Sequence, residues 1–310
     1  MLREKVLEIL FKEDVTQKEL TSRLKSSRSR MSEVLGKLER EKLILRKKVS
    51  QRTILVALNH SKTLRVGILR STEYINVVAT LNQLGNSIPF RVNVYDNSLE
   101  ALKELMTGSE DMVASPLISG YFFYLIDRKI SPVAGIASGG SGTIRRHSSG
   151  RIGTTPLSRM DKDSRNSGNY EQVYYKSIED IIRAYKGKEI DAAQIWEPYL
   201  TMRGGLKTES DGICCCLFTV GNSGQSVSSF LKRYESNVES DLTIREKHAI
   251  SGDLGKLIGV GERDVFSSLN SYKFTTSISK KDLENQVSSF GLPLVKEVDL
   301  FLERCTKVSV

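Results

Sequence analysis

The segment from Ser98 to Leu117, SLEALKELMTGSEDMVASPL, joins two kinds of secondary structure in one short run. SLEALKELMTG predicts a helix, and DMVAS, close behind it, predicts a strand. The following PLISGYFFYLID predicts a second helix. Pro116 suits its start, because the amide hydrogen that proline lacks has no partner at a helix N-terminus. The segment therefore predicts a helix–strand–helix unit.

The same alternation continues on both sides of this segment. The strand patterns LRVGILR, FRVNVYD and SPVAGIASG alternate with helical runs such as INVVATLNQLG. This order predicts βαβ units in a parallel sheet, whose ligands bind where strands end and helices begin. A glycine-rich stretch from Ser138, SGGSGTIRR, predicts a turn that serves as a hinge or an anion-binding nest.

The order of elements resembles the type II periplasmic binding protein fold, in the branch that binds sulfonates, nitrate or thiamine pyrimidine precursors. The matching stretches are SLEALKELMTGSEDMVASPL, the crossover at 138–142, IGTTPLSRM and DAAQIWEPYL, and the likeness covers about residues 64–240. It implies an α/β domain over 64–310, with two lobes that close on a small molecule. The expected lobes are lobe I, about 64–145 and 213–310, and lobe II, about 150–212.

In that fold, the strand-to-helix turns of both lobes line the cleft, so the resemblance implies a set of ligand-binding residues. They are Arg70, Ser71, Thr72, Ser115, Ser141, Thr154, Thr155, Trp196 and Glu197. Thr154 and Thr155 are expected at a helix N-terminus, where free N–H groups attract polar or anionic atoms. Trp196 can instead cap the core, and Glu197 can be a carboxylate at a helix start. Arg70 can pair with Glu73 rather than hold an anion.

Three of the four cysteines are consecutive, Cys214 to Cys216, in the strand pattern ICCCLFTVG. Adjacent cysteines do not favour a disulfide, and a reducing compartment is the simpler interpretation. In a regular strand, Cys214 and Cys216 point to one face and Cys215 to the other, so they are not expected to share a metal ion. The run is similar to that of the pyrimidine-precursor synthases of thiamine biosynthesis, but buried apolar cysteines are favoured. No cofactor and no metal are expected.

The first 62 residues carry most of the net positive charge: they hold 16 Lys and Arg against 8 Asp and Glu, and the other 248 hold 30 against 29. Helical spacing predicts a first helix over Met1–Lys12, and a capping box of Thr16 and Glu19 predicts a second over about Gln17–Leu24. A third helix follows KSSRSR, capped by Ser26 or Ser27 and ending near Glu41, and LILRKK and RTILVAL predict a basic hairpin. This order resembles the winged helix-turn-helix family and predicts such a domain over residues 1–60.

The resemblance implies DNA binding, with the third helix in the major groove and the hairpin on phosphates or a minor-groove edge. The expected DNA contacts are Ser27, Arg28, Ser29, Arg30, Ser32, Lys37, Arg46, Lys47, Lys48 and Arg52. The alternative is a helical module that binds a protein partner and never touches DNA. A solvated basic surface would also explain the charge by itself.

Together, the two resemblances predict a cytoplasmic transcription regulator: a homodimer on double-stranded DNA, whose small polar or anionic effector closes the two-lobed domain. The N-terminus lacks the pattern of a secretory signal, and Pro116 and Gly120 interrupt the longest uncharged stretch, so no membrane span is expected. No convincing catalytic pair is evident, so the chain is not expected to be an enzyme. The alternative is an enzyme on the same fold, a pyrimidine-precursor synthase or a dehydratase-like relative, with an N-terminal regulatory module.

Overall fold

The structure is a computed structural model of the chain. It describes residues 2–10, 13–41, 43–50, 53–59, 63–85, 87–208, 212–221, 224–291, 297–303, 305 and 308–309. The chain divides into two compact units, the first formed by Met1–Arg65 with Gln83–Arg91 and the second by Val66–Asn82 with Val92–Val310. Within the described ranges, no helix is both long and apolar enough to cross a bilayer.

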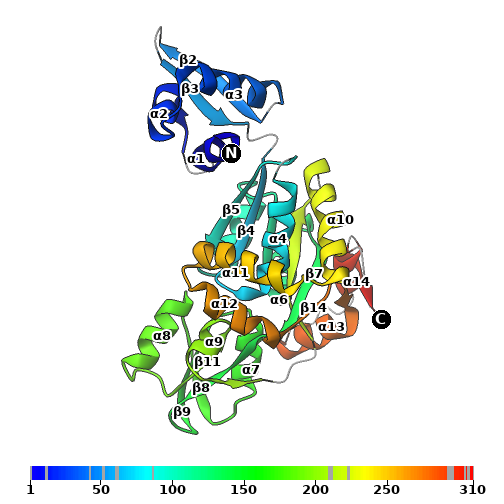
Figure 1. Cartoon of the computed structure of the whole chain (residues 1–310). Helices are drawn as coiled ribbons and strands as arrows, with labels where there is room; N and C mark the ends of the chain where they lie inside the picture. Colours follow the sequence, from blue (N-terminus) through cyan, green and yellow to red (C-terminus); the bar gives the residue numbers. More distant parts are fainter. Residues whose placement is uncertain are drawn as a thin grey trace. The chain divides into compact units, whose positions relative to one another are not determined.

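The first unit contains three helices and a three-stranded sheet (Figure 1). Its elements are α1 (Leu2–Leu10), β1 (Val15–Thr16), α2 (Gln17–Arg23), α3 (Arg28–Arg40), β2 (Ile44–Ser50) and β3 (Thr53–Leu58). β3 lies between β1 and β2 and is antiparallel to both. The three helices and the hairpin are therefore present where the sequence predicts them.

Side-chain caps set the starts of two of these helices. The Thr16 hydroxyl accepts a hydrogen bond from the Glu19 amide at 3.2 Å, and the Glu19 carboxylate accepts one from the Thr16 amide at 2.7 Å. This confirms the predicted capping box. The Ser27 hydroxyl accepts from the Arg30 amide at 3.2 Å and caps α3. The core of the unit is made of Val6, Leu7, Leu10, Val15, Leu20, Met31, Leu35, Leu38, Leu43, Ile44, Val56 and Leu58.

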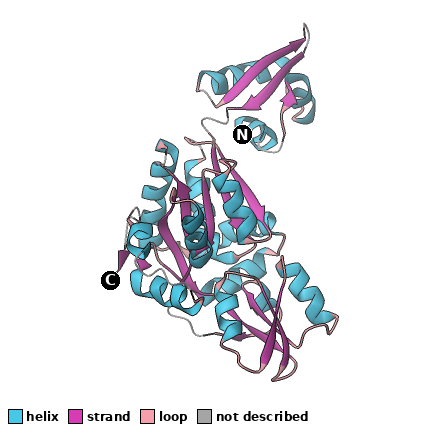
Figure 2. Ribbon diagram, turned by 180° about the vertical axis from the view of Figure 1, so that it is seen from behind, coloured by secondary structure: helices cyan, strands magenta, loops and turns pink. Residues whose placement is uncertain are grey.

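The second unit is built on two sheets with helices packed around them (Figure 2). The six-stranded sheet, with its helices, is lobe I, and its strand order is β14-β7-β13-β6-β4-β5. Its strands are β4 (Leu64–Leu69), β5 (Phe90–Tyr95), β6 (Met112–Pro116), β7 (Ile130–Gly139), β13 (Ile213–Val220) and β14 (Tyr272–Phe274).

The helices of lobe I come from both ends of the second unit's sequence. They are α4 (Ile75–Leu84), α5 (Ser98–Met106), α6 (Leu117–Ile126), α10 (Gln225–Ser240), α11 (Ile244–Ile258), α12 (Glu262–Ser268), α13 (Lys280–Ser289) and α14 (Glu297–Leu302). The short segments are the 3-10 helices η1 (Thr72–Tyr74) and η2 (Leu269–Ser271) and the strand pair β15 (Ile278–Ser279) and β16 (Val308–Ser309).

The five-stranded sheet, with its helices, is lobe II, and its strand order is β10-β9-β11-β8-β12. Its strands are β8 (Ser141–Arg145), β9 (Gly150–Thr154), β10 (Tyr170–Tyr174), β11 (Ala192–Trp196) and β12 (Leu206–Lys207). Its helices are α7 (Arg159–Arg165), α8 (Ile178–Lys186) and α9 (Tyr199–Met202).

Both sheets are mixed, whereas the sequence predicted a parallel one. β4 is parallel to β6, and β9 is parallel to β10 and β11, as the βαβ pattern predicts. β13, however, is antiparallel to β6 and β7, and β8 is antiparallel to β11. The reason is connectivity: β8 and β13 are the strands by which the chain enters lobe II and re-enters lobe I, outside any βαβ unit.

The glycine-rich stretch is a crossover between the lobes, as the resemblance implied for residues 138–142, but the predicted turn is shorter than the stretch SGGSGTIRR because β8 occupies Ser141–Arg145. Only Gly139 and Gly140 bend the chain, with φ of 84° and 71°, and the strand β8 begins at the next residue. Glycine is needed at position 139, because a Cβ atom there would lie 2.4 Å from the Ser271 carbonyl oxygen. The predicted helix start at Thr154 and Thr155 is also wrong, since α7 begins at Arg159 with Ser158 as its cap.

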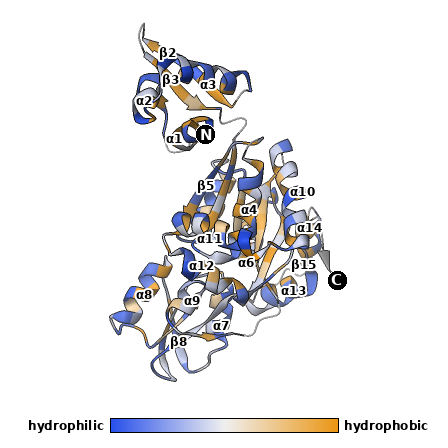
Figure 3. Ribbon diagram, viewed as in Figure 1, coloured by the Kyte–Doolittle hydropathy of each residue, from blue (hydrophilic) through white to orange (hydrophobic). Residues whose placement is uncertain are grey.

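Each lobe has its own apolar core, and Figure 3 shows the hydrophobic residues concentrated on the strands of lobe I and on helices such as α4. In lobe I, α6 and α14 pack on β13, with Tyr121, Phe218 and Phe301 fully buried together. In lobe II, Ile178 and Ile181 of α8 pack against Ile195 of β11. These separate cores leave the facing edges of the lobes free to form a site.

Candidate functional site

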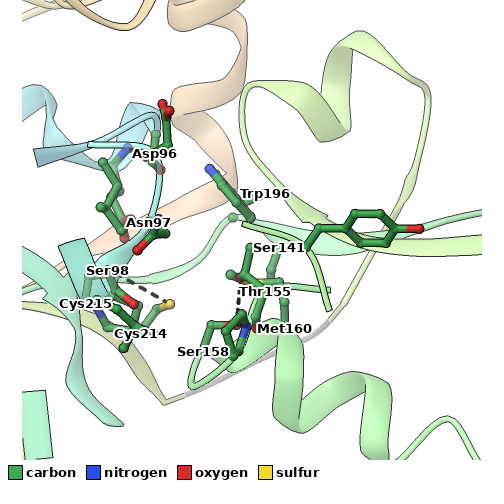
Figure 4. Close-up of a pocket in the computed structure, with 18 of the residues that line it drawn as sticks. Asp96, Asn97, Ser98, Ser141, Thr155, Ser158, Met160, Trp196, Cys214 and Cys215 are labelled. Atoms are coloured by element: carbon green, nitrogen blue, oxygen red, sulfur yellow. Dashed lines mark hydrogen bonds between the residues drawn. The ribbon is translucent and has the colours of Figure 1, made fainter. Parts of the chain in front are cut away.

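A cavity of about 370 Å³ lies within the second unit, between lobe I and lobe II. This volume falls in the range of about 300–1,000 Å³ that is usual for small-molecule sites. Figure 4 shows Asn97, Ser98, Cys214 and Cys215 on one side of the cavity and the lobe II residues on the other. The principal lobe II residues are Ser141, Thr155, Ser158, Met160 and Trp196.

Four of the sequence-predicted ligand residues line this cavity: Ser71, Ser141, Thr155 and Trp196. The Ser71 and Tyr272 hydroxyls are 3.1 Å apart, and Thr155 Oγ1 donates to Ser158 Oγ at 3.2 Å. Ser141 Oγ is buried and has no hydrogen-bond partner among the described residues. This hydroxyl is therefore available to a ligand.

Trp196 presents its ring, and not its N–H group, to the cavity. The indole Nε1 donates to the backbone oxygen of Arg70 at 2.7 Å, a hydrogen bond between the two lobes. The ring lies beside Tyr199, with centroids 6.5 Å apart and the planes nearly perpendicular. Trp196 is partly exposed and lines the cavity, so its free face can stack on a ligand.

Arg70 is not among the lining residues, although the sequence predicted it as a ligand group. Its guanidinium donates to Asp96 at 2.9 Å and to the Ile258 carbonyl oxygen at 3.2 Å, and it lies 3.4 Å from Glu179. The alternative pairing with Glu73 is also wrong. Arg70 instead joins lobe I to the helix α8 of lobe II, so its charge is already balanced.

Thr72, Ser115, Thr154 and Glu197 are buried and are also absent from the cavity wall. Thr72 Oγ1 is 2.8 Å from Ser268 Oγ. Glu197 accepts hydrogen bonds from the Thr201 amide at 3.0 Å, the Thr201 hydroxyl at 2.8 Å and the Ser271 hydroxyl at 2.8 Å. Its carboxylate thus holds the first turn of α9, which is the structural alternative considered from the sequence.

Sequence reasoning missed two turns that contribute to the cavity. Asp96, Asn97 and Ser98 follow β5, and Tyr174, Tyr175 and Lys176 end and follow β10. The rule that ligands bind at the carboxyl ends of strands would have found both turns. Tyr272, from β14, belongs to a short edge strand that the sequence pattern did not indicate.

Cys214 and Cys215 both line the cavity, which contradicts the predicted alternation of the two side chains. Between Ile213 and Cys215, β13 has one residue more than the facing part of β7, and this extra residue is Cys214. A β-bulge of this kind re-aims side chains, and it places the two sulfur atoms 3.8 Å apart. Cys216 is buried in the core of lobe I, as the sequence predicted.

Burial disfavours the charged forms of three acidic groups in this wall. It raises the pKa of the Glu73 carboxyl, which lies beside Cys215, Tyr74 and Ser71. It also raises the pKa of the Cys215 thiol and of the Tyr74 hydroxyl well above their ordinary values. This part of the lobe I wall is therefore polar, and burial favours the neutral forms of its acidic groups.

In the first unit, several predicted DNA contacts are engaged within the protein. Ser27 caps α3, Lys37 pairs with Glu33 at 2.9 Å, and Arg46 pairs with Glu39. The remaining described residues of that set are exposed: Arg28, Ser29, Arg30, Ser32, Lys47 and Lys48. Arg52 lies outside the described residues.

Comparison with solved structures gives the fold of the second unit. The ligand-binding component of an ABC-type import system from Staphylococcus aureus, with zinc bound, matches with a TM-score of 0.65 and 12% identity over 78% of this chain and 99% of the other. The alkanesulfonate-binding protein of Xanthomonas axonopodis pv. citri, bound to MOPS, matches with a TM-score of 0.61 and 15% identity. The match covers 79% of this chain and 98% of that protein. The periplasmic nitrate-binding protein of Synechocystis PCC 6803 matches with a TM-score of 0.65 and 10% identity, over 79% of this chain and 86% of that protein. The chain has a periplasmic-binding-protein-like fold. No protein-family model and no curated sequence matches the chain.

The predictions of a DNA-binding transcription regulator, of double-stranded DNA as its partner, of a homodimer and of a cytoplasmic location are contradicted. One of the structures that share the binding-protein-like fold is described as the ligand-binding component of an import system, and the other two as an alkanesulfonate-binding protein and a periplasmic nitrate-binding protein. That inference rested on the resemblance of residues 1–60 to a winged helix-turn-helix and on their positive charge, and neither a fold resemblance nor charge identifies a partner by itself. The matching structures are binding proteins, which agrees with the expectation that this domain is not an enzyme.

Proposed function

We propose that the binding-protein-like domain captures one small, largely uncharged organic molecule between its lobes, in a solute-binding role like that described for the matching ligand-binding proteins. The observation that carries the proposal is the cavity itself. It lies between two lobes with separate cores, and both lobes contribute to its wall.

The lining favours a ligand with an aromatic or other apolar face. Tyr74, Tyr174, Tyr175, Trp196 and Tyr272 bring aromatic rings to the cavity. Hydroxyl groups from both lobes add hydrogen-bonding positions, which is the usual composition of a specific small-molecule pocket. The ligand therefore needs a ring or hydrocarbon surface and a few polar atoms.

The lining does not favour a small anion. No arginine is among the residues recorded in its wall, and Lys176, the basic residue that is, lies exposed. Two of the matching proteins are described as binding nitrate and alkanesulfonates, which are anions. Because Arg70 is held by two carboxylates, this chain offers such anions little compensation.

We also propose the division of the chain that the sequence predicted, with a winged helix-turn-helix-like domain at about 1–60 ahead of the two-lobed domain at 64–310. The helices α1 to α3 and the antiparallel hairpin of β2 and β3 support the first part. The crossover at Gly139 and Gly140 favours a lobe boundary just before β8.

Trp196 provides a direct test, because it is the one tryptophan of the chain and lines the cavity. The full-length protein is titrated with a panel of small aromatic, heteroaromatic and aliphatic compounds while the tryptophan emission is recorded. We expect a saturable change, with one molecule bound per chain, for an uncharged ring compound. If only nitrate and short sulfonates produce a saturable change, the proposed ligand class is wrong.

A further inference from the structure

Three acidic groups meet in the lobe I wall of the cavity: the carboxyl group of Glu73 and the thiols of Cys214 and Cys215. One ligand atom of each lies within 4.8 Å of the other two. All three residues line the cavity, and the close-up view shows both cysteines on its wall (Figure 4). Among the described residues, these three form the group suited to a metal ion.

The bulge in β13 creates this arrangement. Ile213 is opposite Ser138 and Cys215 is opposite Ala137, so Cys214 is an extra residue with no place in the pairing with β7. In a regular strand, the two thiols would point to opposite faces of the sheet. The bulge turns both toward the cavity, where Glu73 arrives from the 3-10 helix η1.

The spacing of the two sulfur atoms fits tetrahedral coordination of one ion. Two thiolates on a tetrahedral zinc ion, each with a bond of about 2.3 Å, are about 3.8 Å apart. Cys214 Sγ and Cys215 Sγ are separated by 3.8 Å. Three protein ligands leave the fourth coordination position of a tetrahedral ion free, and all three of these residues line the cavity.

The charge of the cluster requires compensation if it ionises. Glu73 is 6% exposed and Cys215 is 2% exposed, and none of the ion pairs between described residues includes Glu73. A buried carboxylate and two thiolates without a basic partner would be strongly disfavoured. A divalent cation supplies the missing positive charge, and thiolates select zinc-like ions over magnesium or calcium.

We propose that Glu73, Cys214 and Cys215 bind one thiophilic divalent cation of the zinc or cadmium class, with its open position toward the cavity. The three metal ligands lie in the wall of the same cavity that is proposed above for the organic ligand, and metal binding does not require that ligand. The Tyr74 hydroxyl, 3.9 Å from Cys215 Sγ, supports the sulfur atom from behind.

The test is a titration of the reduced, chelator-treated, full-length protein with Cd²⁺ alone, followed by the ultraviolet thiolate-to-cadmium charge-transfer absorbance. We expect one Cd²⁺ per chain and competition by Zn²⁺. Cys214→Ser and Cys215→Ser should each weaken binding by more than about 100-fold, since even the loss of a supporting group around a metal costs about 10- to 100-fold. Glu73→Gln should weaken binding but keep the charge-transfer band.

Cys305→Ser is the matched control, because Cys305 lies outside the cluster. It should leave both the stoichiometry and the affinity unchanged, and the emission of Trp196 checks that each variant is folded. Failure of the wild-type protein to bind Cd²⁺ would overturn the proposal. So would an undiminished band in the Cys214→Ser, Cys215→Ser double variant. Because no organic compound is present, neither result bears on the proposed ligand class.

Discussion

Ser141 shows how a single hydroxyl can be assigned to binding rather than to stability. Its Oγ atom is buried beside the cavity and makes no hydrogen bond with the described residues. Ser141→Ala therefore should change the free energy of unfolding by less than about 0.5 kcal/mol, since no protein contact is lost. It should weaken binding of the cavity ligand by about 3- to 10-fold, the value of one hydrogen bond.

The measurement is a titration of Trp196 emission with the best compound of the panel, alongside urea unfolding. Ser228→Ala, on the exposed side of α10, is the matched control and should alter neither quantity. Equal affinities for Ser141→Ala and the wild-type protein would remove Ser141 from the site.

Asp163, outside the site, gives a pH-dependent prediction. Burial raises the pKa of its carboxyl above the ordinary 3.8, and Oδ2 has no hydrogen-bond partner among the described residues. Between 3.8 and the raised value, the folded chain holds a proton that the unfolded chain has released. Stability therefore falls as the pH rises through that window. The amide of Asp163→Asn does not titrate, so the stability of this variant does not fall in that window. Asp163→Asn should therefore be more stable than the wild-type protein near neutral pH, and the difference in stability should disappear below pH 3.8.

Urea midpoints measured at a series of pH values test this. A constant difference between Asp163→Asn and the wild-type protein at all pH values would show that the carboxyl does not titrate differently in the two states.

At the scale of elements, the packing of α6 on β13 depends on Gly120. A Cβ atom at this position would lie 2.2 Å from two atoms of the Phe218 ring, which is fully buried. Gly120→Ala should therefore destabilise the second unit by about 1–3 kcal/mol, because the helix and the ring cannot both keep their places. Urea unfolding followed by Trp196 emission measures it.

Gly36 in α3 is the opposite case, since nothing lies within 4 Å of an added Cβ atom there. Gly36→Ala should stabilise the first unit by up to about 1 kcal/mol through helix propensity, as measured by circular dichroism.

A Gly120→Ala protein as stable as the wild type would mean that α6 moves away from β13 at little cost.

The elements also show what a single sequence can predict. Helix caps at Thr16 and Ser27 and the strand–helix alternation of lobe I are local signals, and they predicted the elements correctly. The antiparallel course of β13 and its bulge depend on partners far away in the sequence, so no local pattern contains them. Trp196 ends a strand of the βαβ pattern and lines the cavity, whereas the bulge that sets the directions of Cys214 and Cys215 could not be predicted.

The predicted ligand-binding residues divide in the same way, into those that line the cavity and those that partners from distant segments hold away from it. Ser71, Ser141 and Thr155 line the cavity, and their part in binding stays a prediction. Ser71 and Thr155 follow the carboxyl ends of β4 and β9, where the general rule for α/β sheets places ligands. Arg70 and Glu197 follow the same rule by position, but Asp96, Glu179 and Ser271 engage them, and those partners come from distant segments. Position along the chain predicts the neighbourhood of a side chain, and its partners decide whether it is free to bind.

At the scale of the whole second unit, Arg70 links the lobes from outside the cavity. It lies on lobe I, pairs with Asp96 of the same lobe and reaches Glu179 of lobe II. Arg70→Met should weaken ligand binding by about 1.5- to 5-fold, because the one partly exposed ion pair that joins the lobes, with Glu179, contributes about 0.2–1 kcal/mol. Small-angle scattering of the ligand-free variant should show a larger radius of gyration than the wild-type protein.

The control for that link is Arg183→Met, which removes an ion pair inside lobe II, with Asp180. It should leave the affinity and the radius of gyration unchanged. Identical behaviour of Arg70→Met and Arg183→Met would show that Arg70 does not hold the lobes together.

The central claim, that the space between the lobes is the binding site, is tested most directly by a crystal structure of the full-length chain with the compound that gives the largest Trp196 response. The account predicts electron density for that compound between the Trp196 ring and the wall formed by Ser98, Cys214 and Cys215, with a polar atom within hydrogen-bond distance of Ser141 Oγ. Density for the compound elsewhere on the protein, with the interlobe cavity empty, would contradict it.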